Sequence, residues 1–208
     1  IEECNLKSVE IAKEAADGKN VAVAGSVSTY GYFLKDGVEN MLPSFNEHLK
    51  ILSNSGVDLI ILEAMSSQYD IVETLLKCSK KINIPIWLSI SCVFDRNKEI
   101  YLGYDDDVKN DKPQIYENFK DTLHKIKKIH SGPILVAHSN MSVTEEAIKI
   151  LKDNYKKIIG AYPNRGYFEK PEWKFSDNIQ PKDYLNKAKS WKNNGAQIIG
   201  GCLSLIHI

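Results

Sequence analysis

The segment WKNNGAQIIGGC, residues 191–202, decides how the rest of this chain is interpreted. It has the pattern of a helix end, a turn, a buried strand, and then two glycines and a cysteine where the strand stops. In a barrel of alternating strands and helices, the carboxyl ends of the strands carry the catalytic groups. Glycines let the backbone approach a ligand closely, and a neighbouring thiolate can bind a metal ion. The segment therefore predicts a functional site around Cys202.

Five further apolar runs precede this one, separated by stretches of different character. The six runs are residues 21–24 (VAVA), 58–62 (DLIIL), 84–90 (IPIWLSI), 133–137 (PILVA), 157–161 (KIIGA) and 197–200 (QIIG). They are continuous rather than alternating, which is typical of strands buried on both faces. Apolar residues recur at helical spacing in 115–129 and 144–155. Repeated strand–helix units predict an α/β fold with a parallel sheet and right-handed crossovers.

Individual residues mark the predicted ends of helices and loops. Ser142 and Glu145 have the spacing of a capping box at the start of one helix. Pro181 suits the first turn of the last helix, and Gly195 suits its C-terminal end. Residues 93–111 contain three consecutive aspartates and are predicted to form a solvated loop.

Composition excludes several classes of function. The chain has 208 residues, of which 43% are hydrophobic and 26% charged, as expected for one globular core. Lys plus Arg and Asp plus Glu both number 27, so no basic excess points to nucleic acid. No apolar run approaches the ~20 residues that span a membrane. The four cysteines are widely scattered, which predicts reduced thiols and a cytoplasmic protein.

Several segments, in order, resemble the homocysteine S-methyltransferase family. Residues 21–31 (VAVAGSVSTYG), 58–63 (DLIILE) and 85–91 are similar to its third, fourth and fifth strands. Residues 161–166 (AYPNRG) are similar to the Tyr-Pro-Asn-x-Gly segment after its seventh strand, and 191–202 to its Gly-Gly-Cys-Cys signature. The resemblance implies a partial (β/α)₈ TIM barrel over residues 1–202, with strands 3 to 8 present and the first two missing.

The resemblance also implies a reaction. The family moves a methyl group from a sulfonium or ammonium donor to the sulfur of homocysteine, giving methionine. A thiol with a pKa of about 8.5 is a poor nucleophile at neutral pH. Zinc with one open position would deprotonate it, and Cys202 carries over as one zinc ligand. The implied partners are a small-molecule thiol and a methyl donor; betaine, S-methylmethionine, S-adenosylmethionine and a corrinoid-linked methyl group are all compatible.

The chain departs from the family's zinc cysteines at two positions. After the sixth strand, where the family has an Asn-Cys-Thr-like segment, Ser139 replaces the cysteine. His138 is adjacent and can ligate through its imidazole; the alternative is that it hydrogen-bonds neighbouring loops or a substrate carboxylate. Leu203 replaces the second cysteine of the signature. The predicted metal ligands are therefore Cys202 and His138.

Four other residues are candidates for substrate binding. By resemblance, Glu63 binds the amino group of homocysteine; the alternative is a salt bridge to a neighbouring loop. Asn164 either contacts the substrate or stabilises a turn, and with Glu63 it completes the catalytic residues. The backbone N–H groups of Gly25 and Ser26 are placed to hold the substrate carboxylate, unless Gly25 only ends its strand. Cys92, at the end of another strand, is interpreted as a small buried thiol.

Residues 203–208, LSLIHI, are expected to be a non-native tail. One codon series for them, CTG TCT CTT ATA CAC ATC, matches a transposon adaptor used in preparing DNA libraries. The alternative is a true terminal helix or tail. If the tail is foreign, Leu203 carries no information about the missing cysteine.

The predicted function is thus that of an S-methyltransferase with a metal-activated thiolate. Within enzymes, the alternative is a divergent barrel with a different metal set or substrate. From another class, the alternative is a degenerate, metal-free TIM barrel that binds a small molecule or a partner without catalysis. A cysteine directly after Cys202 in the complete gene would favour metal chemistry.

Overall fold

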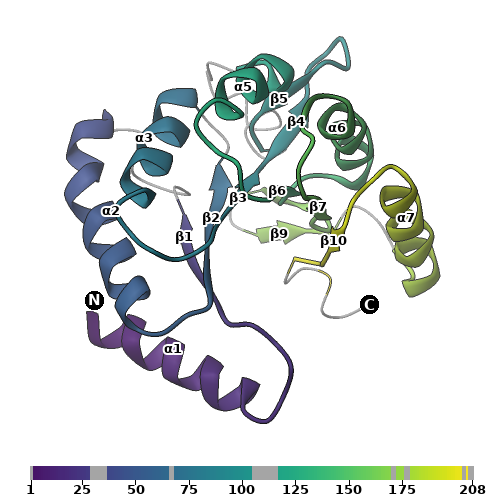
Figure 1. Ribbon diagram of the computed structural model, residues 1–208. Coiled ribbons are helices and arrows are strands. Elements are labelled where there is room, and N and C mark those ends of the chain that lie inside the picture. Colours follow the sequence, from purple (N-terminus) through teal and green to yellow (C-terminus); the bar gives the residue numbers. More distant parts are fainter. Residues whose placement is uncertain are drawn as a thin grey trace.

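Six parallel strands form one sheet with helices on its outside (Figure 1). A computed structural model describes residues 2–28, 37–65, 68–104, 117–169, 172–175, 179–202 and 205. The strands follow chain order: β1 (Ala24–Ser28), β2 (Leu59–Met65), β3 (Ile86–Ile90), β6 (Ile134–Ala137), β7 (Ile159–Tyr162) and β10 (Ile198–Ile199). All neighbouring pairs are parallel, and β1 does not pair with β10 within these residues. The predicted open arc of parallel strands is confirmed.

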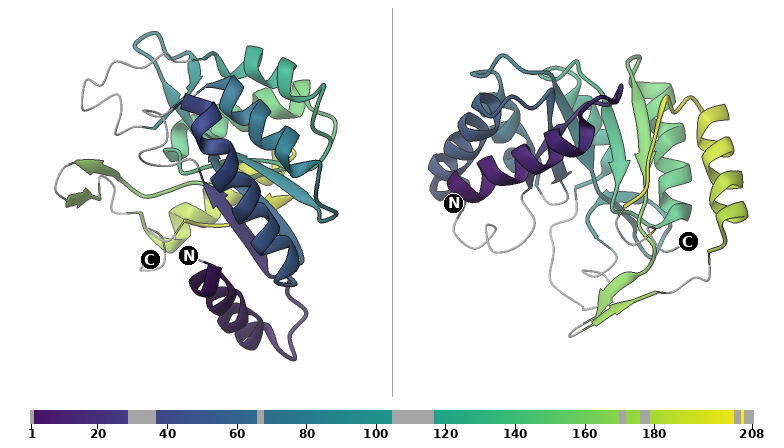
Figure 2. Two further views of the ribbon diagram at one scale, coloured as in Figure 1. Left: turned by 90° about the vertical axis from the view of Figure 1, so that its left-hand side faces the viewer. Right: turned by 90° about the horizontal axis from the view of Figure 1, so that it is seen from below.

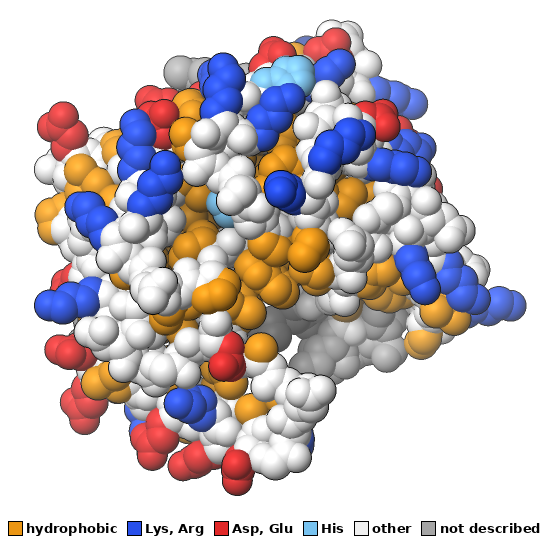
Figure 3. Space-filling view, viewed as in Figure 1, with side chains coloured by type: hydrophobic (Ala, Val, Ile, Leu, Met, Phe, Trp, Pro, Cys, Tyr) orange, Lys and Arg blue, Asp and Glu red, His pale blue; other side chains and the backbone are white. Residues whose placement is uncertain are grey.

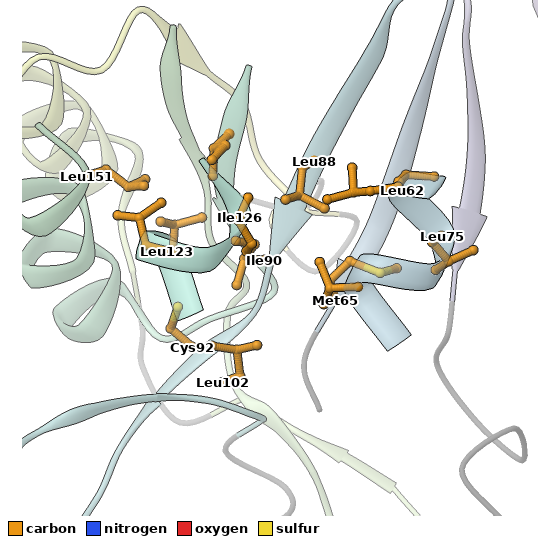
Figure 4. Close-up of a cluster of buried hydrophobic side chains, with 14 of the residues drawn as sticks. Leu62, Met65, Leu75, Leu88, Ile90, Cys92, Leu102, Leu123, Ile126 and Leu151 are labelled. Atoms are coloured by element: carbon orange, nitrogen blue, oxygen red, sulfur yellow. The ribbon is translucent and has the colours of Figure 1, made fainter. Parts of the chain in front are cut away.

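Helices cover the outer face of this arc (Figures 1 and 2). They are α2 (Gly37–Asn54), α3 (Tyr69–Ser79), α5 (Phe119–Ile126), α6 (Met141–Asn154) and α7 (Pro181–Asn193). The first helix, α1 (Glu2–Ala16), lies apart from the sheet and contacts α2 (Figure 1). Between sheet and helices lies a core of fully buried side chains, including Leu62 and Leu88 from strands and Leu75 and Leu123 from helices (Figure 4). Burial of each such side chain contributes about 1.5–3 kcal/mol.

Two antiparallel hairpins extend from the carboxyl ends of the strands. β4 (Cys92–Phe94) pairs with β5 (Ile100–Leu102), and β8 (Tyr167–Glu169) pairs with β9 (Glu172–Lys174). The second hairpin stands out from the body of the molecule (Figure 2). The first corrects the prediction of a solvated loop over 93–111, because Val93 and Leu102 are buried and draw the chain back onto the core. The three aspartates lie outside the described residues.

The ends of several elements differ from their predictions. β1 begins at Ala24, where the predicted strand stops. The N-cap of α6 is Asn140 rather than Ser142, since the Asn140 side chain accepts a hydrogen bond from the Ser142 amide. Pro181 does open α7, and Gly195, with φ of 97°, follows its C-cap as predicted.

The surface combines charged and apolar regions. In the view of Figure 3, charged side chains lie around the outside and hydrophobic side chains gather toward the middle. Of the predicted tail only Leu205 is described; it is buried, and its amide donates to the carbonyl of Cys202. Among the described residues, no helix is both long and apolar enough to cross a membrane.

Candidate active site at the carboxyl ends of the strands

Three of the predicted site residues meet at one rim of the sheet. Glu63 lies near the end of β2, His138 directly follows β6, and Cys202 follows β10. Because neighbouring strands are parallel, their carboxyl ends share this rim. His138 Nε2 lies 2.5 Å from Glu63 Oε1, and His138 Nδ1 lies 3.4 Å from Cys202 Sγ. The imidazole therefore connects the carboxylate to the thiol.

Left-handed backbone conformations direct two parts of this cluster. His138 has φ of 48°, and Ala64, next to Glu63, has φ of 57°. Histidine is among the residues that tolerate this region, whereas alanine adopts it at a cost. The pairing of β2 with β3 shifts register between Leu62 and Met65, and the Tyr104 hydroxyl donates to the Ala64 carbonyl at 2.8 Å. The fold thus holds Glu63 on a locally irregular strand end.

Tyr162 and Ser89 complete the cluster, and neither was singled out from the sequence. The Tyr162 hydroxyl lies 2.6 Å from Glu63 Oε1 and within hydrogen-bonding distance of Ser89 Oγ. Its ring meets that of His138 edge to face, with centroids 5.5 Å apart. Burial and the Glu63 charge raise the pKa of Tyr162, so its hydroxyl stays protonated. The signal in the sequence is the tyrosine of the Tyr-Pro-Asn segment, residues 162–164.

The two partners of His138 change its acid–base behaviour. Burial by itself lowers the pKa of an imidazole, because it penalises the charged form. Here the contacts with Cys202 and Glu63 outweigh burial and raise the pKa of His138 to about 9. Both partners therefore favour the charged imidazole over the neutral one.

Ser139, where the resemblance implies a cysteine, has a structural part here. Its hydroxyl donates to the Ala137 carbonyl and accepts from the Cys92 amide, both at 2.8 Å. With only 2% of its surface exposed, Ser139 ties the end of β6 to the start of β4. The Cys92 thiol belongs to the hydrophobic cluster (Figure 4), and burial raises its pKa well above the usual range. Cys92 is a buried thiol, as predicted.

Asn164 is another of the predicted site residues. The Asn164 amide donates to the Ser139 carbonyl, and its buried Oδ1 has no hydrogen-bond partner among the described residues. Asn164 therefore adjoins the cluster.

Gly25 and Ser26 lie inside a strand rather than at its end, and their part in binding a substrate carboxylate stays a prediction. They lie within β1, opposite Ile60 and Ile61, whereas Ser28 is level with Glu63. β1 begins at Ala24, whereas the predicted strand ends there, so Gly25 and Ser26 fall inside the observed strand. A Cβ at Gly25 would lie 3.1 Å from Leu52, so this glycine lets α2 approach the strand closely.

Two atoms of this cluster, Cys202 Sγ and His138 Nδ1, are spaced like two ligands of one metal ion. Two ligands of a tetrahedral zinc, at about 2.3 Å for sulfur and about 2.0 Å for nitrogen, lie roughly 3.5 Å apart. The separation of 3.4 Å between Cys202 Sγ and His138 Nδ1 matches this value. Glu63 contacts the opposite ring nitrogen and so is not a third ligand of the same ion. Across the described residues, no three His, Cys, Asp or Glu side chains are grouped to share one ion.

Fold and site together define an α/β barrel-type protein with a thiol, an imidazole and a carboxylate at its carboxyl rim. The family model for homocysteine S-methyltransferase matches residues 1–205, and the chain belongs to this family. The predicted resemblance is therefore confirmed.

Individual relatives agree with this assignment. Homocysteine S-methyltransferase 1 of Zea mays is 29% identical over 231 residues, which cover 94% of this chain and 65% of that protein. Selenocysteine methyltransferase of Astragalus bisulcatus is 25% identical over 236 residues, with the same coverage of each. This chain thus spans about two thirds of the length of these relatives.

A solved structure shares the fold. The apo form of the homocysteine methyltransferase MmuM from Escherichia coli superposes with a TM-score of 0.68 at 21% identity, covering 97% of this chain and 68% of that one. A metallated form of the same enzyme gives a TM-score of 0.65.

Proposed function

We propose that this chain is the larger part of a methyltransferase that transfers a methyl group to a thiol, with homocysteine as the acceptor and methionine as the product. Family membership supports thiol methyl transfer, and relatives named for homocysteine and selenocysteine support an amino acid with a thiol or selenol. The observation that carries the proposal is the pairing of Cys202 Sγ with His138 Nδ1 at the carboxyl rim.

Cys202 and His138 are the proposed protein ligands of a zinc ion in this site. Their separation supports this assignment, and the metallated form of the Escherichia coli relative is consistent with it. When bound, zinc acts as a Lewis acid that lowers the pKa of a substrate thiol. The role of the chain's own residues is to hold and orient the ligands, and to align the thiol with a positively charged methyl donor.

Asn164 and Glu63 are the proposed contacts for the amino-acid part of the substrate. Oδ1 of Asn164, which is buried and has no hydrogen-bond partner in the part of the chain that the structure describes, is an acceptor suited to an ammonium group. Glu63 is a carboxylate of which 17% of the side chain is exposed, and it supplies negative charge at the same rim. The proposed compartment is the cytoplasm, which keeps thiols reduced, since all four cysteines are free.

The test uses the full-length protein and a Cys202→Ala variant. We expect the wild type to bind about one zinc ion and to form methionine from homocysteine with a sulfonium or ammonium donor. Cys202→Ala should lose both properties together, because it removes one ligand. The matched control is Cys4→Ser, which alters an exposed cysteine in α1 and should change neither. Methyl transfer that persists in Cys202→Ala would contradict the metal-activated mechanism. A wild type with neither property would favour the metal-free binding barrel.

A further inference from the structure

Three polar side chains lie close to a single oxygen atom of Glu63; two belong to strands and one directly follows a strand. Oε1 lies 2.5 Å from His138 Nε2, 2.6 Å from the Tyr162 hydroxyl and 3.4 Å from Ser89 Oγ. Ser89 lies in β3, Tyr162 ends β7 and His138 follows β6. A carboxylate oxygen with this many contacts is fixed in position, and it fixes its partners in turn.

His138 is held on opposite sides of its ring. Glu63 engages Nε2, and Cys202 faces Nδ1. When a carboxylate engages one ring nitrogen, the tautomer and the ring orientation are set, and the other nitrogen is presented to a metal ion. The side-chain exposures, 27% for His138 and 17% for Glu63, leave limited room for the pair to rearrange.

We infer that Glu63 is a positioning residue, which holds His138 so that Nδ1 and the Cys202 thiolate bind one metal ion together. This inference rests on the proposed function and deepens it, because it assigns to Glu63 a part that is independent of the substrate. The hydroxyl groups of Tyr162 and Ser89 hydrogen-bond to the Glu63 carboxylate and hold it in place. The proposed metal centre then has an imidazole and a thiolate as ligands. The Glu63 carboxylate is hydrogen-bonded to the ring nitrogen that does not bind the metal.

The surroundings of Glu63 are built to keep it in place. The part-buried Tyr162 hydroxyl lies 2.6 Å from Oε1 and donates a hydrogen bond to it. The next residue, Ala64, is held in a left-handed conformation by a hydrogen bond from Tyr104. Strained backbone of this kind persists only where its surroundings over-determine it. A simple surface salt bridge would not need such support.

The test measures metal affinity in the absence of any substrate. Full-length protein is titrated with Co²⁺, and the near-ultraviolet charge-transfer band from thiolate to cobalt is followed; Zn²⁺ affinity is obtained by competition with a chelator. Loss of a partner behind a metal-bound histidine typically weakens metal binding about 10–100-fold. We expect Glu63→Ala to weaken Co²⁺ and Zn²⁺ binding by this factor while the band persists at saturation, because Cys202 still ligates.

Graded variants and a matched control sharpen the result. Glu63→Gln keeps an oxygen acceptor for Nε2 and should weaken binding less than Glu63→Ala. Tyr162→Phe should weaken it in the same direction by a smaller factor. The control is Glu73→Ala, which removes another glutamate paired with a tyrosine hydroxyl, that of Tyr69 at 3.2 Å, on α3. It should leave the metal affinity unchanged.

The outcomes separate this inference from the proposed function. If the wild type binds metal and Glu63→Ala binds it equally well, Glu63 does not position His138; a raised KM for homocysteine in that variant would then make Glu63 a substrate contact alone. If the wild type binds neither Co²⁺ nor Zn²⁺, both the metal site and this inference are overturned. If Glu63→Ala fails to fold by circular dichroism, Glu63→Gln and Tyr162→Phe decide, and unchanged affinity in both overturns the inference.

Discussion

At the scale of single residues, the Ser139 side chain stabilises the structure around the site through its hydrogen bonds. Its hydroxyl joins the end of β6 to the amide of Cys92, so the residue next to His138 connects two strand ends. Serine suits this part because a hydroxyl both donates and accepts, whereas a thiol does either weakly.

Ser139→Ala should lower the free energy of unfolding by about 1–3 kcal/mol, because it leaves the buried Cys92 amide without its acceptor. Urea denaturation at neutral pH measures this change. Ser53→Ala is the control, since the Ser53 hydroxyl bonds Lys50 on the exposed side of α2 and should contribute little. Equal stability of the two variants would show that the hydroxyl of Ser139 is not holding the strand ends together.

His130 makes the stability of the fold depend on pH. It is 9% exposed, and burial lowers its pKa below 6.5 although its ring contacts the Pro133 carbonyl. As pH falls through 6.5, the unfolded chain takes up the proton before the folded chain does, so the free energy of unfolding decreases. His48, whose pKa burial also lowers, acts in the same direction.

We therefore expect His130 and His48 to lower the urea midpoint as the pH falls from about 7.5 to about 5.5, whereas His138, whose pKa is raised to about 9, contributes in the opposite direction. His130→Gln, which cannot titrate, should flatten part of this decline, and the double variant with His48→Gln should flatten more. A midpoint that depends on pH equally in the wild type and in the double variant would contradict the argument.

At the scale of elements, the turn from β6 to α6 contributes three consecutive side chains that position the site and begin the helix. His138, Ser139 and Asn140 are consecutive, and they provide an imidazole, a buried hydroxyl and a helix cap. Asn140→Ala should cost about 1 kcal/mol of stability, because the Ser142 amide loses its acceptor. Asn140→Asp retains an acceptor and should remain near the wild type. Thermal unfolding compares the three proteins, and an Asn140→Ala variant as stable as Asn140→Asp would argue against the cap.

The same turn shows what could and could not be predicted from the sequence. Strand-end logic located Glu63, His138 and Cys202, because a parallel sheet brings its carboxyl ends to one rim. It did not find Ser89 or Tyr162, since their parts depend on the direction of side chains from neighbouring strands.

Element boundaries have a similar explanation. The six strands were predicted because continuous apolar runs stand out. β1 was placed too early, since VAVA is more apolar than the AGSVS that pairs with β2. The β4–β5 hairpin was missed because its strands have three residues each and lie in a charged stretch. Such short strands are set by packing rather than by local propensity.

At the scale of the whole molecule, the described sheet has two free edges, β1 and β10. Apolar side chains are exposed at and near these edges: Ile199 in β10 is 39% exposed and Val21, before β1, is 60% exposed. Unpaired edges and exposed apolar side chains favour pairing with another chain. The 208-residue chain expressed by itself should therefore self-associate.

Ile199→Lys should reduce this association, because a charge on an edge strand opposes pairing. Ile158→Lys is the control: Ile158 is 43% exposed, but it precedes β7, which is paired on both sides. Light scattering coupled to gel filtration reports the mass distribution of each variant. A monodisperse monomer for the unmodified chain, or equal effects of the two lysines, would contradict the argument.

The positive φ at position 138 also limits how this protein can be altered by directed evolution. Only glycine, asparagine, aspartate and histidine enter that region of backbone space readily, and branched side chains are largely barred from it. A saturation library at this position would yield folded protein from a handful of codons. Within that handful only histidine offers a neutral nitrogen ligand and only aspartate an anionic oxygen ligand, so the metal preference of the proposed site could be changed by few single substitutions at this position.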